Sequence, residues 1–311
     1  MCTRIFWNDN DVAKVTSRCM DWAVDDEPQL WFMPRGTERT GGTQAGAAAW
    51  RSTYSSVATS MWGVGSSDGM NEKGLAAHAL FLYGVQPPTD TGRGTVTIAL
   101  WVQYVLDNFS TVAEVIAHID EIELLAPPIR GQYVGAHLAL EDPSGDSAII
   151  EPVNGEMVVH HGREFTVMAN SPTYDEQLTN LARFAPFGGD LRPPGDITSD
   201  DRFVRASYFR HYLPEPASTA EAVAGVFGLS QNVAVPIGAP YDDGGVYPTW
   251  WHTVSDVTHL TYYFWSTRSP SAIWVDLAAL ADGTEVLALD PRDGALVGNV
   301  TDALRADSLV Y

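Results

Sequence analysis

The stretch MCTRIFWNDNDVAKVTSRCMDW, residues 1–22, predicts a β-hairpin at the beginning of the chain. Residues 2–7 form one strand, an Asn- and Asp-rich turn follows at 8–11, and 12–22 form the second strand. In an antiparallel pair with this turn at its centre, the numbers of opposed residues sum to about 19 or 20. The hairpin therefore predicts that Cys2 lies beside Ser17 or Arg18.

Cys2 stands out because removal of Met1 would make it the first residue. It would then carry both a nucleophilic thiol and a free α-amine, whose ordinary pKa of about 7.7 to 8.0 suits proton transfer near neutral pH. A terminal amine that activates a nucleophile is an established form of covalent catalysis. We expect Arg18 to favour the thiolate and Asp21 to orient the amine. The alternative is an ordinary cysteine at position two. Cys19 is expected to be a small buried hydrophobe.

The composition excludes several classes of function. Among 311 residues, 18 are Lys or Arg and 39 are Asp or Glu, which gives a net charge of −21. Such a surface repels phosphate backbones and anionic headgroups, so neither nucleic acid nor membrane is expected as a partner. No apolar run reaches the roughly 18 residues of a membrane span. Two cysteines provide no disulfide framework, and no Cys/His cluster has the spacing of a zinc site.

Hydrophobic periodicity alternates between strand-like and helix-like segments along the chain. Helices are predicted at 97–109, 111–125, 178–184, 202–212 and 218–229, with strand patterns before, between and after them. This order predicts an α+β fold in which helices cover antiparallel sheets. No linker, repeat or low-complexity segment divides the chain, so residues 1–311 are expected to form a single domain.

Several short motifs follow one another between residues 1 and 264. They are Met-Cys-Thr-Arg at 1–4, Ser-Arg-Cys-Met-Asp-Trp at 17–22, Gly-Met-Asn-Glu-Lys-Gly-Leu at 69–75, Met-Ala-Asn-Ser-Pro at 168–172, Arg-Phe-Val-Arg at 202–205, Thr-Val-Ser-Asp at 253–256 and Tyr-Tyr-Phe at 262–264. Together they resemble the choloylglycine hydrolase family of N-terminal-nucleophile hydrolases, which includes penicillin V acylases and conjugated bile acid hydrolases. The resemblance implies a four-layer αββα sandwich of two antiparallel sheets flanked by helices, and an amidohydrolase that cleaves linear amide C–N bonds without a cofactor.

The resemblance also implies a catalytic set, which is Cys2, Arg18, Asp21, Asn170, Arg202 and Phe81. In that set Cys2 is the nucleophile, Asn170 offers its side-chain amide to the oxyanion, and Arg202 completes the polar cluster. The family's further oxyanion donor is a main-chain N–H that falls here at Phe81, where relatives that cleave bile salts carry Asn. Loss of one such donor typically costs about 100- to 1,000-fold in rate.

The expected substrate pocket is rich in aromatic side chains. Beside Phe81, its expected lining residues are Met20, Trp22, Trp31, Trp62 and Tyr83. For each aromatic, core packing is an equally good explanation. Such a pocket matches a phenoxyacetyl or fatty acyl group better than a bulky steroid. Penicillin V is therefore the first substrate expected, followed by N-acyl homoserine lactones and conjugated bile acids.

The expected assembly follows from the same family resemblance, and the expected compartment follows from the N-terminal sequence. Only 32 positions separate Asn170 from Arg202, whereas bile salt hydrolases have an extended loop here that takes part in tetramer assembly. The shorter stretch argues against the tetramer of those enzymes. A homo-oligomer is still expected, either a dimer or a tetramer. If Met1 is the native start, the lack of a signal peptide pattern predicts a cytoplasmic protein. A periplasmic or secreted protein is expected if a signal peptide was removed.

Two other interpretations compete with this one. Gly65-Ser66-Ser67-Asp68-Gly69 fits the G-x-S-x-G pattern, but a nucleophile elbow needs a helix after it, and the residues that follow predict a turn. A retained Met1 would block the amine and leave a catalytically silent binding or assembly protein. His252 and His259 lack an H-E-x-x-H partner, so no metal site is expected.

Overall fold

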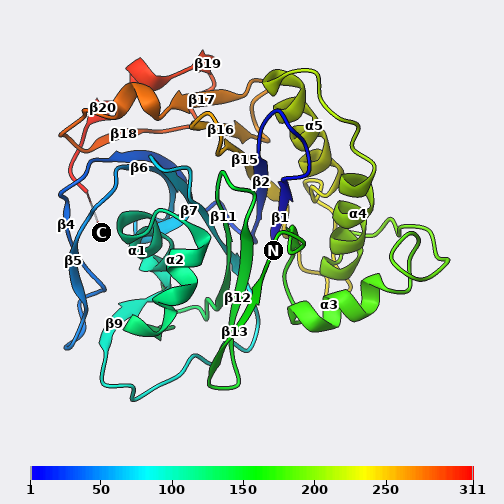
Figure 1. Ribbon diagram of the computed structural model, residues 1–311, viewed down its shortest axis with the longest axis horizontal. Coiled ribbons are helices and arrows are strands. Elements are labelled where there is room, and N and C mark those ends of the chain that lie inside the picture. The colour runs from blue at the N-terminus through cyan, green and yellow to red at the C-terminus, as the bar shows by residue number, and fades with distance from the viewer. Residues whose placement is uncertain (1, 310) are drawn as a thin grey trace.

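The N-terminal hairpin lies inside the first of two large β-sheets that pack face to face (Figure 1). The computed structural model describes residues 2–309 and 311. Sheet I has seven strands in the order β14 (Val167–Met168), β1 (Cys2–Trp7), β2 (Val15–Asp21), β15 (Thr249–Asp256), β16 (Thr261–Ser266), β17 (Ile273–Asp276) and β19 (Gly298–Asn299). Its strands pair antiparallel except for β17 with β19.

Sheet II faces sheet I across the core and has nine strands. Their order is β13 (Glu156–His161), β12 (Ser147–Val153), β11 (Ala136–Glu141), β8 (Ala76–Phe81), β7 (Gly65–Asn71), β6 (Ser56–Met61), β3 (Gln29–Met33), β18 (Leu287–Leu289) and β20 (Arg305–Ala306). Two small sheets pair β4 (Glu38–Thr40) with β5 (Ala49–Arg51), and β9 (Gly94–Thr97) with β10 (Ile122–Leu125).

Helices cover the outer faces of both sheets (Figure 1). On sheet I these are α3 (Tyr174–Leu181), α4 (Ser199–His211) and α5 (Thr219–Asn232), and on sheet II they are α1 (Trp101–Asn108) and α2 (Val112–Ala117). The predicted four-layer αββα sandwich is therefore confirmed. A single amphipathic face on each helix suffices for this arrangement, because each helix buries one side against a sheet and leaves the other in water.

The helix boundaries differ from the prediction where tertiary pairing decides them. The segment predicted as one helix over 111–125 ends as a helix at Ala117, and 122–125 instead form β10, which pairs in parallel with β9. The helix predicted at 178–184 begins earlier, at Tyr174, because Thr173 and Glu176 form a capping box. The helix predicted at 218–229 forms as α5, and Ser218 caps it, since its side chain accepts from the N–H of Glu221.

The predicted register of the N-terminal hairpin is wrong by two residues. Cys2 lies opposite Met20, and Arg18 lies opposite Arg4. The reason is the turn, which takes all seven residues between the ends of β1 and β2 rather than the four of the Asn/Asp run. Because side chains alternate along a strand, a shift of two keeps Arg18 on the same face as Cys2.

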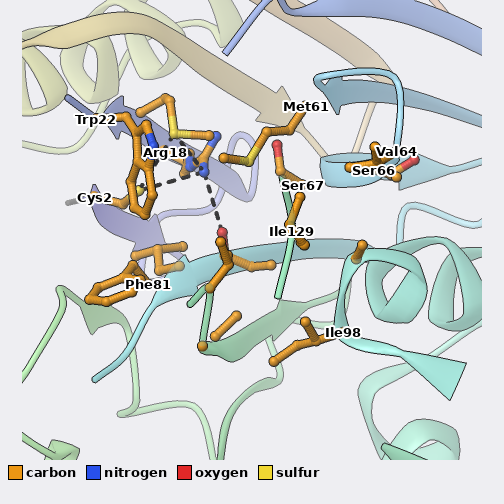
Figure 2. Close-up of a pocket in the computed structure, with 18 residues that line it drawn as sticks. Cys2, Arg18, Trp22, Met61, Val64, Ser66, Ser67, Phe81, Ile98 and Ile129 are labelled. Carbon is orange, nitrogen blue, oxygen red and sulfur yellow. Dashed lines mark hydrogen bonds between the residues drawn. The ribbon is translucent and has the colours of Figure 1, made fainter. Parts of the chain in front are cut away.

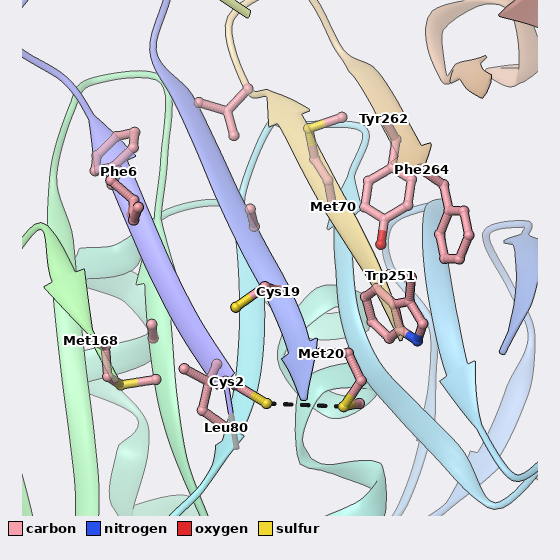
Figure 3. Close-up of a cluster of buried hydrophobic side chains, with 14 of the residues drawn as sticks. Cys2, Phe6, Cys19, Met20, Met70, Leu80, Met168, Trp251, Tyr262 and Phe264 are labelled. Atoms are coloured by element: carbon pink, nitrogen blue, oxygen red, sulfur yellow. Dashed lines mark hydrogen bonds between the residues drawn. The ribbon is translucent and has the colours of Figure 1, made fainter. Parts of the chain in front are cut away.

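The main core fills the space between the two sheets. Phe6 from β1, Met70 from β7, Leu80 from β8, and Tyr262 and Phe264 from β16 are among its buried side chains (Figure 3). Cys19 is fully buried, as predicted. A hydrophobic core of this kind holds β1 rigidly, and with it the residue at its first position.

Candidate active site

Cys2 opens β1 at the edge of the inter-sheet core, where its side chain meets Arg18 and Met20 from the neighbouring strand. The thiol sulfur lies 3.6 Å from Nη2 of Arg18 and 3.9 Å from the sulfur of Met20. Cys2 is only 2% exposed. The buried guanidinium of Arg18 and the thioether of Met20 therefore both lie against the Cys2 sulfur.

Arg18 is a fully buried guanidinium. It stacks over the ring of Trp251, with 4.4 Å between its Cζ and the ring centroid, and its Nη2 donates to the carbonyl of Ala79 at 3.3 Å. Burial alone would lower the pKa of Arg18, but the charges of Cys2, Asp68 and Asp26 outweigh it and leave that pKa raised. Arg18 therefore stays charged beside the sulfur.

Asn170 approaches Cys2 from the loop before α3. Its Oδ1 accepts from the main-chain N–H of Cys2 and from Nη2 of Arg202, the latter at 3.0 Å. Its Nδ2 donates to the carbonyl of Phe81 at 2.8 Å. An amide nitrogen carries two hydrogens, so one remains to face a substrate oxygen. The side chain thus spans the gap between the end of β8 and the start of β1.

Arg202 on α4 ties these groups together from the other side of sheet I. Its Nη1 donates to the carbonyl of Cys2 at 2.6 Å, and lies 3.5 Å from a carboxylate oxygen of Asp21. The other oxygen of Asp21 accepts from the hydroxyl of Thr249 at 2.6 Å. The structure therefore brings five of the six predicted catalytic residues into one buried cluster, and places Phe81 beside it through its carbonyl.

The thiol lies at one end of a pocket of about 550 Å³, including its open mouth. Figure 2 shows Cys2, Arg18, Trp22 and Phe81 at this end, and Val64, Ser66 and Ile98 at the other. The remaining lining residues are apolar except for Ser67; they are Met20, Met61, Gly65, Ser67, Ala79, Leu80, Ala99, Ile129, Val134, Gly135 and Ala136. A long apolar pocket that ends at a thiol suits an apolar group bound beside the sulfur.

The predicted pocket residues divide into two groups. Met20, Trp22 and Phe81 line the pocket, and the rings of Trp22 and Phe81 meet edge to face at 5.5 Å. The other three lie outside the lining. Trp62 packs behind Trp22, Tyr83 is 75% exposed, and Trp31 is buried on the far face of sheet II, where its Nε1 donates to Ser60.

A second group of residues holds Asn170 in place and was not singled out from the sequence. His137 on β11 bonds to the carbonyl of Ala169 at 2.9 Å and to the carboxylate of Glu151 at 3.0 Å. The hydroxyl of Ser199 accepts from the N–H of Asn170 at 2.9 Å. The signal in the sequence was slight, because each is an isolated polar residue within a strand or at a helix start.

The competing motifs have ordinary positions. Ser67 lies within β7, and the chain continues into another strand rather than a helix, so the nucleophile elbow is absent there. Across residues 2–309 and 311, no group of three or more His, Cys, Asp or Glu side chains gathers as metal ligands would. Over the same residues, no helix has the length and apolar character needed to span a membrane.

Comparison with known proteins places this geometry in a family. The sequence pattern of the linear amide C–N hydrolases, choloylglycine hydrolase family, matches residues 2–287. Penicillin V acylase from Pectobacterium atrosepticum is 39% identical over 304 residues, which cover 89% of this chain and 81% of that protein. A bile salt hydrolase/transferase from Bifidobacterium longum subsp. longum is 24% identical over 302 residues, or 88% of this chain and 94% of that protein.

The fold comparison agrees with the sequence comparison. The solved structure of penicillin V acylase from Agrobacterium tumefaciens superposes with a TM-score of 0.90 and 37% identity, covering 99% of this chain and 98% of that one. A family pattern that spans most of the chain, together with relatives at this identity, leads to one conclusion: the chain belongs to the choloylglycine hydrolase family and is a linear amide C–N hydrolase.

Proposed function

We propose that this hydrolase uses Cys2 as its nucleophile after removal of Met1, and that it cleaves penicillin V-type amides. The observation that carries the proposal is the position of the Cys2 sulfur at the end of an apolar pocket, 3.6 Å from a buried guanidinium. Asn170 supports it, because its amide bonds both to the main chain of Cys2 and to that of Phe81.

In the first half of the reaction the thiolate attacks the amide carbonyl carbon. A C–S bond forms, and the carbonyl π electrons move to the oxygen. The free hydrogen on Nδ2 of Asn170 and the main-chain N–H of Phe81 stabilise this oxyanion. The α-amine of Cys2, which took the thiol proton, gives it to the leaving nitrogen as the C–N bond breaks. An amine product leaves, and the acyl group stays on Cys2 as a thioester.

In the second half water attacks the thioester. The α-amine accepts a proton from the water, the C–S bond breaks, and the sulfur recovers a proton as the carboxylic acid departs. Arg202 positions the nucleophile during both halves through its bond to the carbonyl of Cys2. All bonds are made and broken between substrate, water and one residue, so no cofactor takes part.

The pocket favours an aromatic or straight acyl group. Trp22 and Phe81 form an aromatic wall beside the thiol, which suits the phenoxyacetyl group of penicillin V. The relatives from Pectobacterium and Agrobacterium are penicillin V acylases. N-acyl homoserine lactones are the second candidate substrates, because their acyl chains are linear and apolar. Conjugated bile acids are the third, since the bile salt hydrolase/transferase relative is more distant.

We predict that Cys2→Ala abolishes hydrolysis, because no other group can form the thioester. The measurement is release of free amine from penicillin V, penicillin G, acyl homoserine lactones and glycocholate. Cys19→Ala is the matched control, since Cys19 is equally buried and burial raises the pKa of its thiol well above the usual value. Undiminished turnover by Cys2→Ala would exclude Cys2 as the nucleophile.

Mass spectrometry of the purified protein tests the processing step on which the mechanism depends. We expect the intact mass to lack Met1. A retained Met1 would leave no free amine on Cys2 and would support the alternative of a catalytically silent binding or assembly protein.

A further inference from the structure

A chain of buried charged side chains runs across the inter-sheet core next to the candidate site. Arg4 donates from Nε to Glu141 at 2.9 Å, and the other oxygen of Glu141 lies 2.5 Å from Nε2 of His78. Nδ1 of His78 bonds to Asp68, and the hydroxyl of Tyr262 donates to Asp68 at 2.5 Å. All five side chains are fully buried. Figure 3 shows Tyr262, from β16 of sheet I, among the buried hydrophobic side chains between the sheets.

The five residues come from five strands and both sheets. Arg4 and Tyr262 lie on β1 and β16 of sheet I, whereas Glu141, His78 and Asp68 lie on β11, β8 and β7 of sheet II. Arg4 is two residues after Cys2 on the same strand face, and it pairs across the hairpin with Arg18. The charged chain and the candidate nucleophile therefore share the two strands of the hairpin.

The charges in this chain cancel at neutral pH. Burial alone would lower the pKa of His78, but Asp68 and Glu141 raise it to about 9, so the ring is an imidazolium with a carboxylate at each nitrogen. Burial would raise the pKa of Glu141, yet Arg4 and His78 hold it at about 2. Two cations thus balance two anions, as a buried ionic group must be balanced.

Arg18 is a further cation, next to this group of four charged side chains whose charges sum to zero. Its charge interacts with those of Asp68 and Asp26. Asp26 lies in the loop after β2, and both of its carboxylate oxygens accept from Nε1 of Trp251. Arg202 and Asp21 add a further pair of opposite charges on the α4 side of Cys2. The total electrostatic potential at the sulfur is the sum of the contributions of these charges, so it depends on how far the charge of His78 offsets that of Asp68.

We propose that His78 is a positioning residue for the nucleophile: it holds Asp68 in place and offsets its negative charge, so that the positive potential of Arg18 dominates at the Cys2 sulfur. The proposal rests on the role of Cys2 in the proposed function. Without the positive charge of His78 this group of buried side chains carries one excess negative charge. That charge makes the electrostatic potential at the sulfur more negative and disfavours the thiolate. Without the negative charge of Asp68 the total electrostatic potential at the sulfur is more positive, which favours the thiolate.

Two variants with opposite expected effects test this proposal. The measurement is the rate of Cys2 alkylation by iodoacetamide as a function of pH, read by peptide mapping so that Cys19 is counted separately. We expect His78→Gln to move the midpoint of this profile up by about one pH unit, which is about a tenfold slower alkylation at a fixed pH below the midpoint. Asp68→Asn should move the midpoint down. Loosened packing would move both variants in the same direction.

His252→Gln is the matched control, because His252 is also fully buried but lies on the opposite face of sheet I, paired with Ser230. It should leave the midpoint unchanged. Equal midpoints for wild type and folded His78→Gln would overturn the proposal. Should that variant not fold, Asp68→Asn decides alone, and a midpoint that does not fall overturns the proposal.

Alkylation needs no substrate, so this result is separate from the test of the proposed function. A protein that is alkylated as expected yet hydrolyses no amide contradicts the proposed function and leaves the role of His78 intact. If the enzyme hydrolyses amides but wild type and His78→Gln have the same alkylation profile, the role of His78 is contradicted and the proposed function stands. In active enzyme the acid side of the kcat/KM profile should shift together with the alkylation midpoint.

Discussion

At the scale of single residues, Asn170 is held from several sides within the candidate site. Its side chain bonds to Cys2, Arg202 and Phe81, and its main chain is held by Ser199. A side chain fixed in this way needs little reorganisation when an oxyanion forms. Preorganised donors of this kind stabilise developing charge best.

We predict that Asn170→Ala lowers kcat for penicillin V hydrolysis by about 100- to 1,000-fold with a much smaller change in KM. The reason is that the lost N–H contributes only when the carbonyl oxygen becomes negative. Asn232→Ala, at the exposed end of α5, is the control and should match wild type. Thermal unfolding of both variants separates this effect from misfolding. An unchanged kcat would remove Asn170 from the oxyanion site.

The sequence predicted which residues meet at this site better than it predicted how they meet. Cys2 and Arg18 do lie together, but through a hairpin register two residues away from the predicted one. Turn composition indicates that a hairpin exists, whereas the packing of its strands against α5 and sheet II selects its loop length. His78 and Glu141 could not be paired in advance, because only the sheet order brings β8 and β11 together.

At the scale of secondary-structure elements, the wall of the pocket depends on the close approach of β7 to the turn before α1. A Cβ on Gly65 would stand 1.9 Å from the carbonyl oxygen of Ala99 and 2.6 Å from its carbon. Both residues line the pocket. No side chain larger than hydrogen fits there without moving one backbone segment away from the other.

We predict that Gly65→Ala destabilises the protein by about 1–3 kcal/mol, as overpacking of a tight core does, and lowers kcat/KM by widening the pocket. Gly195→Ala is the matched control, because nothing lies within 4 Å of its Cβ position. Urea unfolding gives the free energies, and the acyl substrates give kcat/KM. Coincident unfolding curves for Gly65→Ala and wild type would show that the segments separate freely.

Elements with their own local signals were predicted well, and those that depend on distant partners were not. The Ser218 cap and the apolar face of α5 are both local, and the helix forms where expected. In contrast, 122–125 continue a helical pattern in sequence but become β10, because β9 offers an edge some 25 residues earlier in the chain. Trp31 likewise faces away from the pocket, because it packs into the hydrophobic cluster between sheet II and α1.

At the scale of the whole molecule, acid should weaken the fold through groups buried in their basic form. Burial lowers the pKa of His252 to about 3 from the ordinary 6.5. Below pH 6.5 His252 binds a proton in the unfolded chain but not in the folded chain. The free energy of unfolding therefore falls as the pH drops towards 3. Glu141 acts in the same direction at lower pH, because its folded pKa of about 2 lies below its ordinary value of 4.5.

We predict that His252→Gln reduces this acid sensitivity. Glutamine does not titrate, so the unfolding free energy of the variant relative to wild type should rise as the pH falls from 6.5, by up to about 5 kcal/mol near pH 3. His211→Gln, at an exposed position on α4, is the control and should show no such trend. Urea titrations at several pH values provide the comparison, and parallel curves for His252→Gln and wild type would contradict the prediction.

The aromatic wall of the pocket also allows ligand binding to be followed by intrinsic tryptophan fluorescence. Trp22 lines the pocket beside Cys2, and its ring meets those of Phe81 and Trp62. An acyl group that fills the pocket replaces solvent against this indole. We therefore expect the contribution of Trp22 to the emission of the ten tryptophans to change in wavelength or intensity on binding. In the Cys2→Ala protein, for which we predict no hydrolysis, fluorescence titration would thus rank candidate ligands by affinity alone.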